Sequence, residues 1–75
     1  MSNYLGQVVK AARGGKSLRK FAREIGISHT YLDSLEKGYD PRTGKRPNIS
    51  VATLQKISNA TGIDVSILIS EAVKQ

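Results

Sequence analysis

The sequence predicts an all-α protein, a compact bundle of five short helices without a sheet. Two observations support this fold class. Apolar residues recur at i, i+3, i+4 and i+7 in successive segments, which is the spacing of one helix face. Most of these segments also follow a Ser or Asp and stop at a Gly, the residue types that favour the two ends of a helix. The 75 residues suffice for one domain, residues 1–75, with one hydrophobic core.

The first predicted helix lies before the glycine pair at residues 14–15, which ends it. Ser2 or Asn3 can cap its N-terminus, because a short polar side chain accepts hydrogen bonds from the free N–H groups of the first turn. Its apolar face comprises Leu5, Val8, Val9 and Ala12. This spacing predicts one buried face and one solvated face.

The second predicted helix begins after its cap, Ser17, and ends at Gly26, where the chain can turn in the left-handed conformation. Its apolar face comprises Leu18, Phe21, Ala22 and Ile25. Ala22 is small, so another helix can cross close to it. We therefore expect two helices that cross steeply at this residue.

The third predicted helix begins after its cap, Ser28, and ends at Gly38. Ile27 precedes the cap and can pack on Leu32, which fixes the path of the chain into the helix. The side chains expected to point outward are His29, Thr30, Asp33, Ser34 and Lys37. Short polar side chains near the N-terminus are typical of a helix that enters the DNA major groove. The alternative is an ordinary helical hairpin with a solvated face.

The last two predicted helices repeat the same pattern of cap and apolar face. Ser50 caps the fourth helix and Gly62 ends it, and Asp64 opens the fifth. The inner face of the fourth helix comprises Val51, Leu54, Ile57 and Ser58. The inner face of the fifth helix comprises Val65, Leu68, Ile69 and Ala72. The fifth helix offers more apolar surface than the domain needs, so we expect Ile67, Leu68, Ile69 and Val73 to pair with a second copy.

The charge points to a polyanionic partner. The formal net charge is +6 and the pI is about 10.0, which favours nucleic acid or an anionic membrane surface. Residues 1–23 contain no acid and six basic residues, which are Lys10, Arg13, Lys16, Arg19, Lys20 and Arg23. The charge is therefore concentrated near the first two helices, whereas a merely solvated surface mixes the two signs.

These segments together resemble a known family. SLRKFAREIGIS followed by HTYLDSLEKG is similar to the helix-turn-helix of lambda-repressor-like, Cro/repressor-type regulators of bacteria and phages, the xenobiotic-response-element (XRE) family. The loop YDPRTGKRP resembles one found in a subgroup of this family, and the likeness extends through GIDVSILI. The resemblance implies a five-helix domain whose second and third helices form the helix-turn-helix. It also implies that the protein binds double-stranded DNA.

Four side chains of the third helix are candidates for base contacts, which are His29, Thr30, Asp33 and Ser34. His29 can donate or accept at a base edge, although an idle surface histidine is the alternative. Thr30 can contact a thymine methyl group, and Ser34 can bond to either kind of base. Asp33 can accept from the cytosine N4 amine or repel wrong sequences.

The candidates for phosphate contacts are Arg13, Lys16, Ser17, Arg19, Ser28, Tyr31, Lys37, Arg42, Lys45 and Arg46. The resemblance implies the contacts of Arg13 and Lys16, for which simple solubility is the alternative. Arg19 stands at a helix N-terminus, which favours an anion. In the family an acid at the position of Glu36 commonly pairs with a basic residue of the first helix, and here Lys10 or Arg13 can serve.

Residues 39–48 form the one long loop that we expect. Asp40-Pro41 and Thr43-Gly44 are turn signals, and Pro47 keeps the chain extended before the fourth helix. Its three cations predict contact with phosphates or with a narrow minor groove, where an arginine reads shape. The alternative is a solvated, mobile loop.

The composition argues against several other classes of protein. The chain has no Cys and a single His, so neither a thiolate or histidine metal site nor a catalytic pair can form, and we expect no cofactor and no enzyme activity. No apolar run approaches the roughly 20 residues of a membrane span, and no signal pattern is present. We therefore expect a cytoplasmic protein of bacterial or phage origin, without a small-molecule ligand.

The sequence thus predicts a sequence-specific transcriptional regulator, a repressor that binds a palindromic operator as a dimer. The alternative is an antitoxin-like or adaptor module that binds a protein and contacts DNA only secondarily. Single-stranded RNA is a weaker option, because 5% aromatic residues provide few platforms on which bases can stack.

Overall fold

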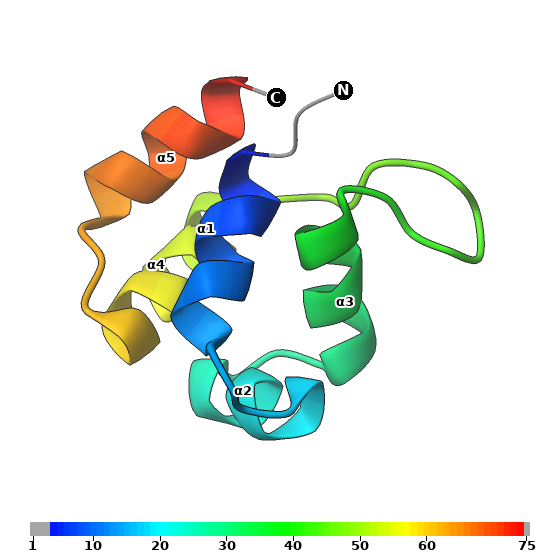
Figure 1. The fold of residues 1–75 in the computed structure, drawn as a ribbon. Coiled ribbons are helices and arrows are strands. Elements are labelled where there is room, and N and C mark those ends of the chain that lie inside the picture. The colour runs from blue at the N-terminus through cyan, green and yellow to red at the C-terminus, as the bar shows by residue number, and fades with distance from the viewer. Residues whose placement is uncertain (1–3, 75) are drawn as a thin grey trace.

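The computed structural model describes residues 4–74, which form five α-helices and no strand (Figure 1). The helices are α1 (Tyr4–Arg13), α2 (Leu18–Ile25), α3 (His29–Lys37), α4 (Val51–Thr61) and α5 (Val65–Lys74). The predicted all-α, five-helix fold is therefore confirmed. The candidate caps Ser2 and Asn3 lie outside the described residues.

The predicted helix ends are confirmed at three helices. The Oγ atoms of Ser17, Ser28 and Ser50 each accept from the backbone N–H three residues further on, at 3.1 Å. Gly26 ends α2 with φ of 94°, and its N–H donates to the Ala22 carbonyl at 2.8 Å. A side chain other than glycine is strained at this φ. The caps therefore fix where the chain turns between helices.

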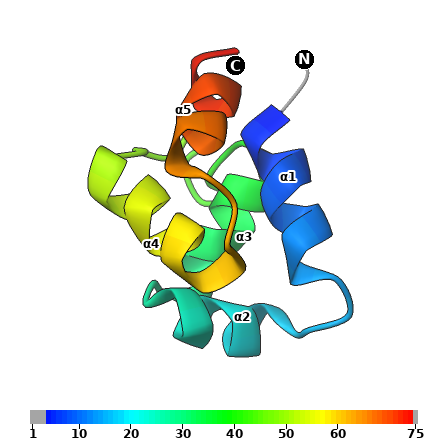
Figure 2. The same ribbon diagram turned by 90° about the vertical axis from the view of Figure 1, so that its left-hand side faces the viewer.

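All five helices contribute to one core. α1 packs against α3 and α5, and α2 packs against α3 and α4 (Figure 2). The buried apolar residues are Leu5, Val9, Phe21, Ala22, Ile25, Leu32, Leu35, Leu54, Ile57 and Leu68. Because α2 and α3 both pack into this core, the position of the outer face of α3 is fixed.

Two predicted core positions are wrong. Val51 is 66% exposed, because it is the first residue of α4 and the inner face begins at Leu54. Ile69 is 39% exposed, because the peripheral helix α5 packs mainly on α1 and α4 and Leu68 is its buried residue. Leu68 in turn is fully buried, so it is not available to a second copy as we expected.

The start of α1 and the end of α5 lie at the same end of the molecule, opposite α2 (Figure 1). The Nζ of Lys74 stands 5.9 Å from the centre of the Tyr4 ring, a cation–π distance. The helix-turn-helix is thus at the far end from the described chain ends. None of the helices in residues 4–74 has the length and apolar character needed to cross a membrane.

Candidate nucleic-acid interface

The turn between α2 and α3 is tight because one carbonyl closes it. The Ala22 carbonyl accepts from the N–H of Gly26 at 2.8 Å and from that of Ile27 at 3.0 Å. Ala22 itself is 2% exposed, in the core to which both helices contribute. A small side chain at this point lets α3 lie close across α2 and fixes the direction in which α3 faces solvent.

The N-terminal turn of α3 carries the exposed polar side chains that the sequence predicted. His29 and Thr30 are exposed, and Asp33 is partly exposed one turn later. An Asp33 oxygen lies 3.0 Å from the Nζ of Lys37, and this hydrogen bond raises the pKa of Lys37. Asp33, on the same face of α3, therefore partly compensates the positive charge of Lys37.

The predicted outward position of Ser34 is wrong. Ser34 is 3% exposed, and its Oγ donates to the Thr30 carbonyl at 3.1 Å. The loop of residues 39–48 folds back along this side of α3, so Ser34 lies at the base of a groove instead of on the surface. Its hydroxyl proton is used inside the helix, and the contact of Ser34 with a base stays a prediction.

Arg13 is hydrogen-bonded to two other groups of the protein. Its Nε and Nη2 donate to the two Glu36 carboxylate oxygens at 2.8 and 3.0 Å, and its Nη1 donates to the Lys16 carbonyl at 2.9 Å. The bond to Glu36 raises the pKa of Arg13 above its ordinary value. The pairing of Glu36 with α1 is therefore confirmed, with Arg13 as the partner, and the phosphate contact of Arg13 stays a prediction.

Lys16 and Arg19 lie at the start of α2, on either side of the cap Ser17, and all three are exposed. The Nζ of Lys16 donates to Glu24 at 2.7 Å, which lowers the pKa of that carboxyl, and stands 5.8 Å from the Phe21 ring centre. Lys16 is thus partly neutralised by an exposed ion pair.

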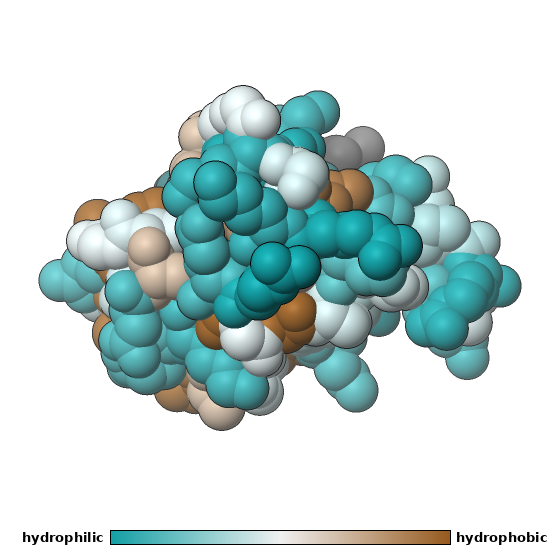
Figure 3. Space-filling view, turned by 90° about the horizontal axis from the view of Figure 1, so that it is seen from below, coloured by the Kyte–Doolittle hydropathy of each residue, from teal (hydrophilic) through white to brown (hydrophobic). Residues whose placement is uncertain are grey.

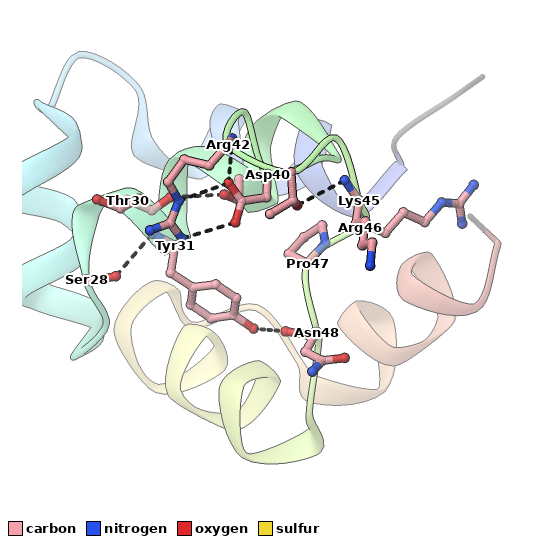
Figure 4. Close-up of a pocket in the computed structure, with 11 residues that line it drawn as sticks. Ser28, Thr30, Tyr31, Asp40, Arg42, Lys45, Arg46, Pro47 and Asn48 are labelled. Atoms are coloured by element: carbon pink, nitrogen blue, oxygen red, sulfur yellow. Dashed lines mark hydrogen bonds and ion pairs between the residues drawn. The ribbon is translucent and has the colours of Figure 1, made fainter.

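Tyr31 anchors the 39–48 loop instead of presenting its hydroxyl to solvent. The hydroxyl donates to the Asn48 carbonyl and lies 3.5 Å from the Thr53 Oγ1 on α4 (Figure 4). The hydroxyl proton is thus used at the loop's end, and the phosphate contact of Tyr31 stays a prediction. The side chain instead connects α3, the loop and the N-terminus of α4.

The 39–48 loop is folded on itself, with Asp40 at its centre. The Asp40 N–H donates to the Lys45 carbonyl at 2.7 Å, and the Asp40 carbonyl accepts from Gly44 at 2.7 Å. An Asp40 carboxylate oxygen accepts from the Arg42 N–H at 2.9 Å, and Gly44 has φ of 73°. The loop is closed by hydrogen bonds, although the rest of it stands out from the body as a hydrophilic projection (Figure 3).

A groove of about 730 Å³ separates this loop from the N-terminal half of α3 (Figure 4). α3 contributes Ser28, Thr30, Tyr31 and Ser34, and the loop contributes residues that include Arg42, Lys45 and Arg46. The groove therefore joins the exposed turn of α3 to a strongly basic segment. Sequence reasoning missed the part played by Asp40, although the Asp-Pro-x-Thr-Gly pattern signals a turn in which an Asp side chain accepts from the backbone.

We expect Tyr31→Phe to loosen the loop while the helices stay folded, because the Asn48 carbonyl loses its donor. The cost to global stability should be about 1 kcal/mol. Trypsin cleavage after Arg42 and Lys45 should become several times faster. Tyr39→Phe is the matched control, since Tyr39 is 47% exposed on the other limb of the loop. Equal cleavage of the two variants would show that Tyr31 does not hold the loop.

A two-helix unit with a glycine turn and an exposed polar N-terminal turn on its second helix defines the class of the protein, a helix-turn-helix DNA-binding protein. The family model described as "Helix-turn-helix" matches residues 9–68. The chain therefore belongs to the Cro/repressor-type, XRE family of helix-turn-helix domains. No curated protein and no solved structure gives a significant match. Family membership implies DNA binding and a role in transcription regulation, and the family is non-enzymatic.

Proposed function

We propose that the protein is a sequence-specific regulator of transcription, a repressor that occupies a promoter operator with α3 in the major groove. The observation that carries this proposal is the exposed pair His29 and Thr30 at the capped first turn of α3, beside a basic loop. Both side chains can hydrogen-bond base edges, and Thr30 can also touch a thymine methyl group. Asp33, one turn later, can accept from a cytosine N4 amine.

Groups at the helix starts and in the loop bind the DNA phosphates on either side of the major groove. The hydroxyls of Ser17 and Ser28 accept from the backbone with a lone pair, so each keeps its proton to donate to a phosphate. Arg19 provides charge from α2, Lys16 from the turn before α2, and Lys37 from α3. Lys45 and Arg46 provide it from the loop, where both are exposed.

The proposed repressor acts as a homodimer on a palindromic operator, in the bacterial cytoplasm. Ile67, Ile69 and Val73 are 52%, 39% and 78% exposed on α5, and this apolar surface is the support for pairing. α5 lies away from α3, so a dimer formed there leaves both α3 helices able to reach DNA (Figure 1). Two-fold symmetry of the protein would then be mirrored in the half-sites.

The salt dependence of binding to a duplex tests the DNA contacts of the loop. Each phosphate contact contributes about 0.9 to the fall of log K with log salt, so Lys45→Ala combined with Arg46→Ala should reduce the slope by about 1.8. Affinity should fall alike for all sequences. Lys56→Ala, an exposed lysine on α4, is the control and should leave the slope unchanged. An unaltered slope in the double variant would remove the loop from the interface.

A further inference from the structure

Asp40 fixes the orientation of the Arg42 side chain. Its Nε donates to one Asp40 carboxylate oxygen at 3.3 Å and its Nη2 donates to the other at 3.1 Å. The Arg42 backbone N–H donates to the same carboxylate at 2.9 Å. The Arg42 side chain is 75% exposed, whereas that of Asp40 is 20% exposed. The acid is therefore fixed in the loop and the guanidinium is presented to the outside.

The remaining donors of Arg42 form a fork. A guanidinium has five N–H groups, and Asp40 takes those on the edge shared by Nε and Nη2. The opposite edge keeps one N–H from Nη1 and one from Nη2, which are parallel. Two parallel donors match the O6 and N7 acceptors that guanine presents in the major groove. The Asp40 pairing thus leaves free the edge that an arginine uses toward guanine.

The position of Arg42 brings this edge to α3. Arg42 lines the same groove as Ser28 and Thr30, so the side chain reaches back from the loop to the N-terminal turn of α3 (Figure 4). That turn is the part of α3 that meets base edges in the function proposed above. An arginine there lies on the major-groove side, not on the side of a neighbouring minor groove.

We propose that Arg42, positioned by Asp40, reads a guanine in the major groove next to the base pair that Thr30 contacts. This inference rests on the proposed function and makes the pair Asp40 and Arg42 a determinant of its specificity. It replaces the phosphate or minor-groove contact that the sequence suggested for Arg42. The acid also compensates the charge of Arg42, which weakens its attraction to the phosphates of unrelated sequences.

The test compares variants on duplexes derived from the sequence that the wild-type protein enriches, with each position changed in turn to the other three base pairs. At one position the wild type should prefer guanine, and Arg42→Ala and Arg42→Lys should reduce this preference by about 5- to 150-fold. Lysine lacks the planar fork of the guanidinium, so its positive charge alone should not restore the preference for guanine.

Asp40→Asn removes the negative charge but keeps the turn, because the amide oxygen can still accept from the Arg42 backbone N–H. This variant should relax the preference at the same position and bind random-sequence duplex more tightly than the wild type. Asp64→Asn is the matched control. Asp64 also accepts from the N–H two residues on at 2.9 Å, but at the start of α5. Asp64→Asn should change neither the base preference nor the affinity for random-sequence duplex.

Four results would overturn the inference. If Arg42→Ala lowers affinity for every sequence equally and flattens the salt slope, Arg42 is a phosphate contact. If Asp40→Asn lowers the melting temperature without altering base preference, Asp40 is a loop stabiliser only. A wild-type preference that no Arg42 variant affects would refute this inference alone, whereas a wild type without any base preference would refute the proposed function as well.

Discussion

Glu36→Gln is expected to lower the free energy of unfolding by about 2 kcal/mol. The Glu36 side chain is 7% exposed, and its two oxygens accept from Nε and Nη2 of Arg13, which is 20% exposed. In the variant an amide NH₂ replaces one acceptor and faces an N–H donor, while the Arg13 charge loses its counterion. The pair connects α1 to α3, so its loss weakens the support of α3 directly.

Thermal unfolding measures this effect. For a domain of this size, 1 kcal/mol corresponds to about 4–8 °C in Tm, so the expected shift is roughly 8–16 °C. Glu24→Gln is the matched control. Its partner Lys16 and Glu24 itself are 45% and 37% exposed, and exposed pairs contribute at most about 1 kcal/mol. Equal shifts in the two variants would mean that the Arg13 pair is as weak as a surface pair.

Ala22→Leu is expected to destabilise the fold by about 1–3 kcal/mol and to abolish specific DNA binding. Ala22 is 2% exposed between α2 and α3, and its carbonyl holds the turn through Gly26 and Ile27. Three additional carbon atoms cannot be accommodated unless the helices move apart, which changes the direction of α3. The loss of binding should therefore exceed what the fraction of unfolded protein explains.

Melting curves and binding to an enriched duplex, measured on the same preparations, test this prediction. Ala60→Leu is the control, because Ala60 is exposed on α4 and leucine is equally tolerated in a helix. It should leave both quantities nearly unchanged. A normal melting curve together with intact binding in Ala22→Leu would refute the close packing of α2 on α3.

The helices and the turn could be predicted from the sequence because their signals are local. A serine cap, an apolar face and a terminal glycine lie within a dozen residues, and Ser17, Ser28 and Gly26 act as expected. The family resemblance also predicted which face of α3 points outward. His29 and Thr30 are exposed as their helical positions indicated, and their contact with bases stays a prediction.

The contacts that could not be predicted are those that distant parts of the chain make. Ser34 lies on the polar side of α3 by helical spacing, yet it is 3% exposed and lines the groove between α3 and the loop that follows. Arg13 is one of six cations in the first 23 residues, and only its distance to Glu36 singles it out. Tyr31 bonds to Asn48, 17 residues away. A pattern with a period of 3.6 residues contains no information on such contacts.

Selection from a random duplex pool at near-physiological salt tests whether the protein binds a specific operator as a dimer. We predict an enriched palindrome whose half-sites are about one helical turn apart, because two copies of α3 would enter successive major grooves. Enrichment of no sequence, with only binding that falls steeply with salt, would contradict it. That result would favour the alternative of a protein-binding, antitoxin-like or adaptor module that contacts DNA through charge alone.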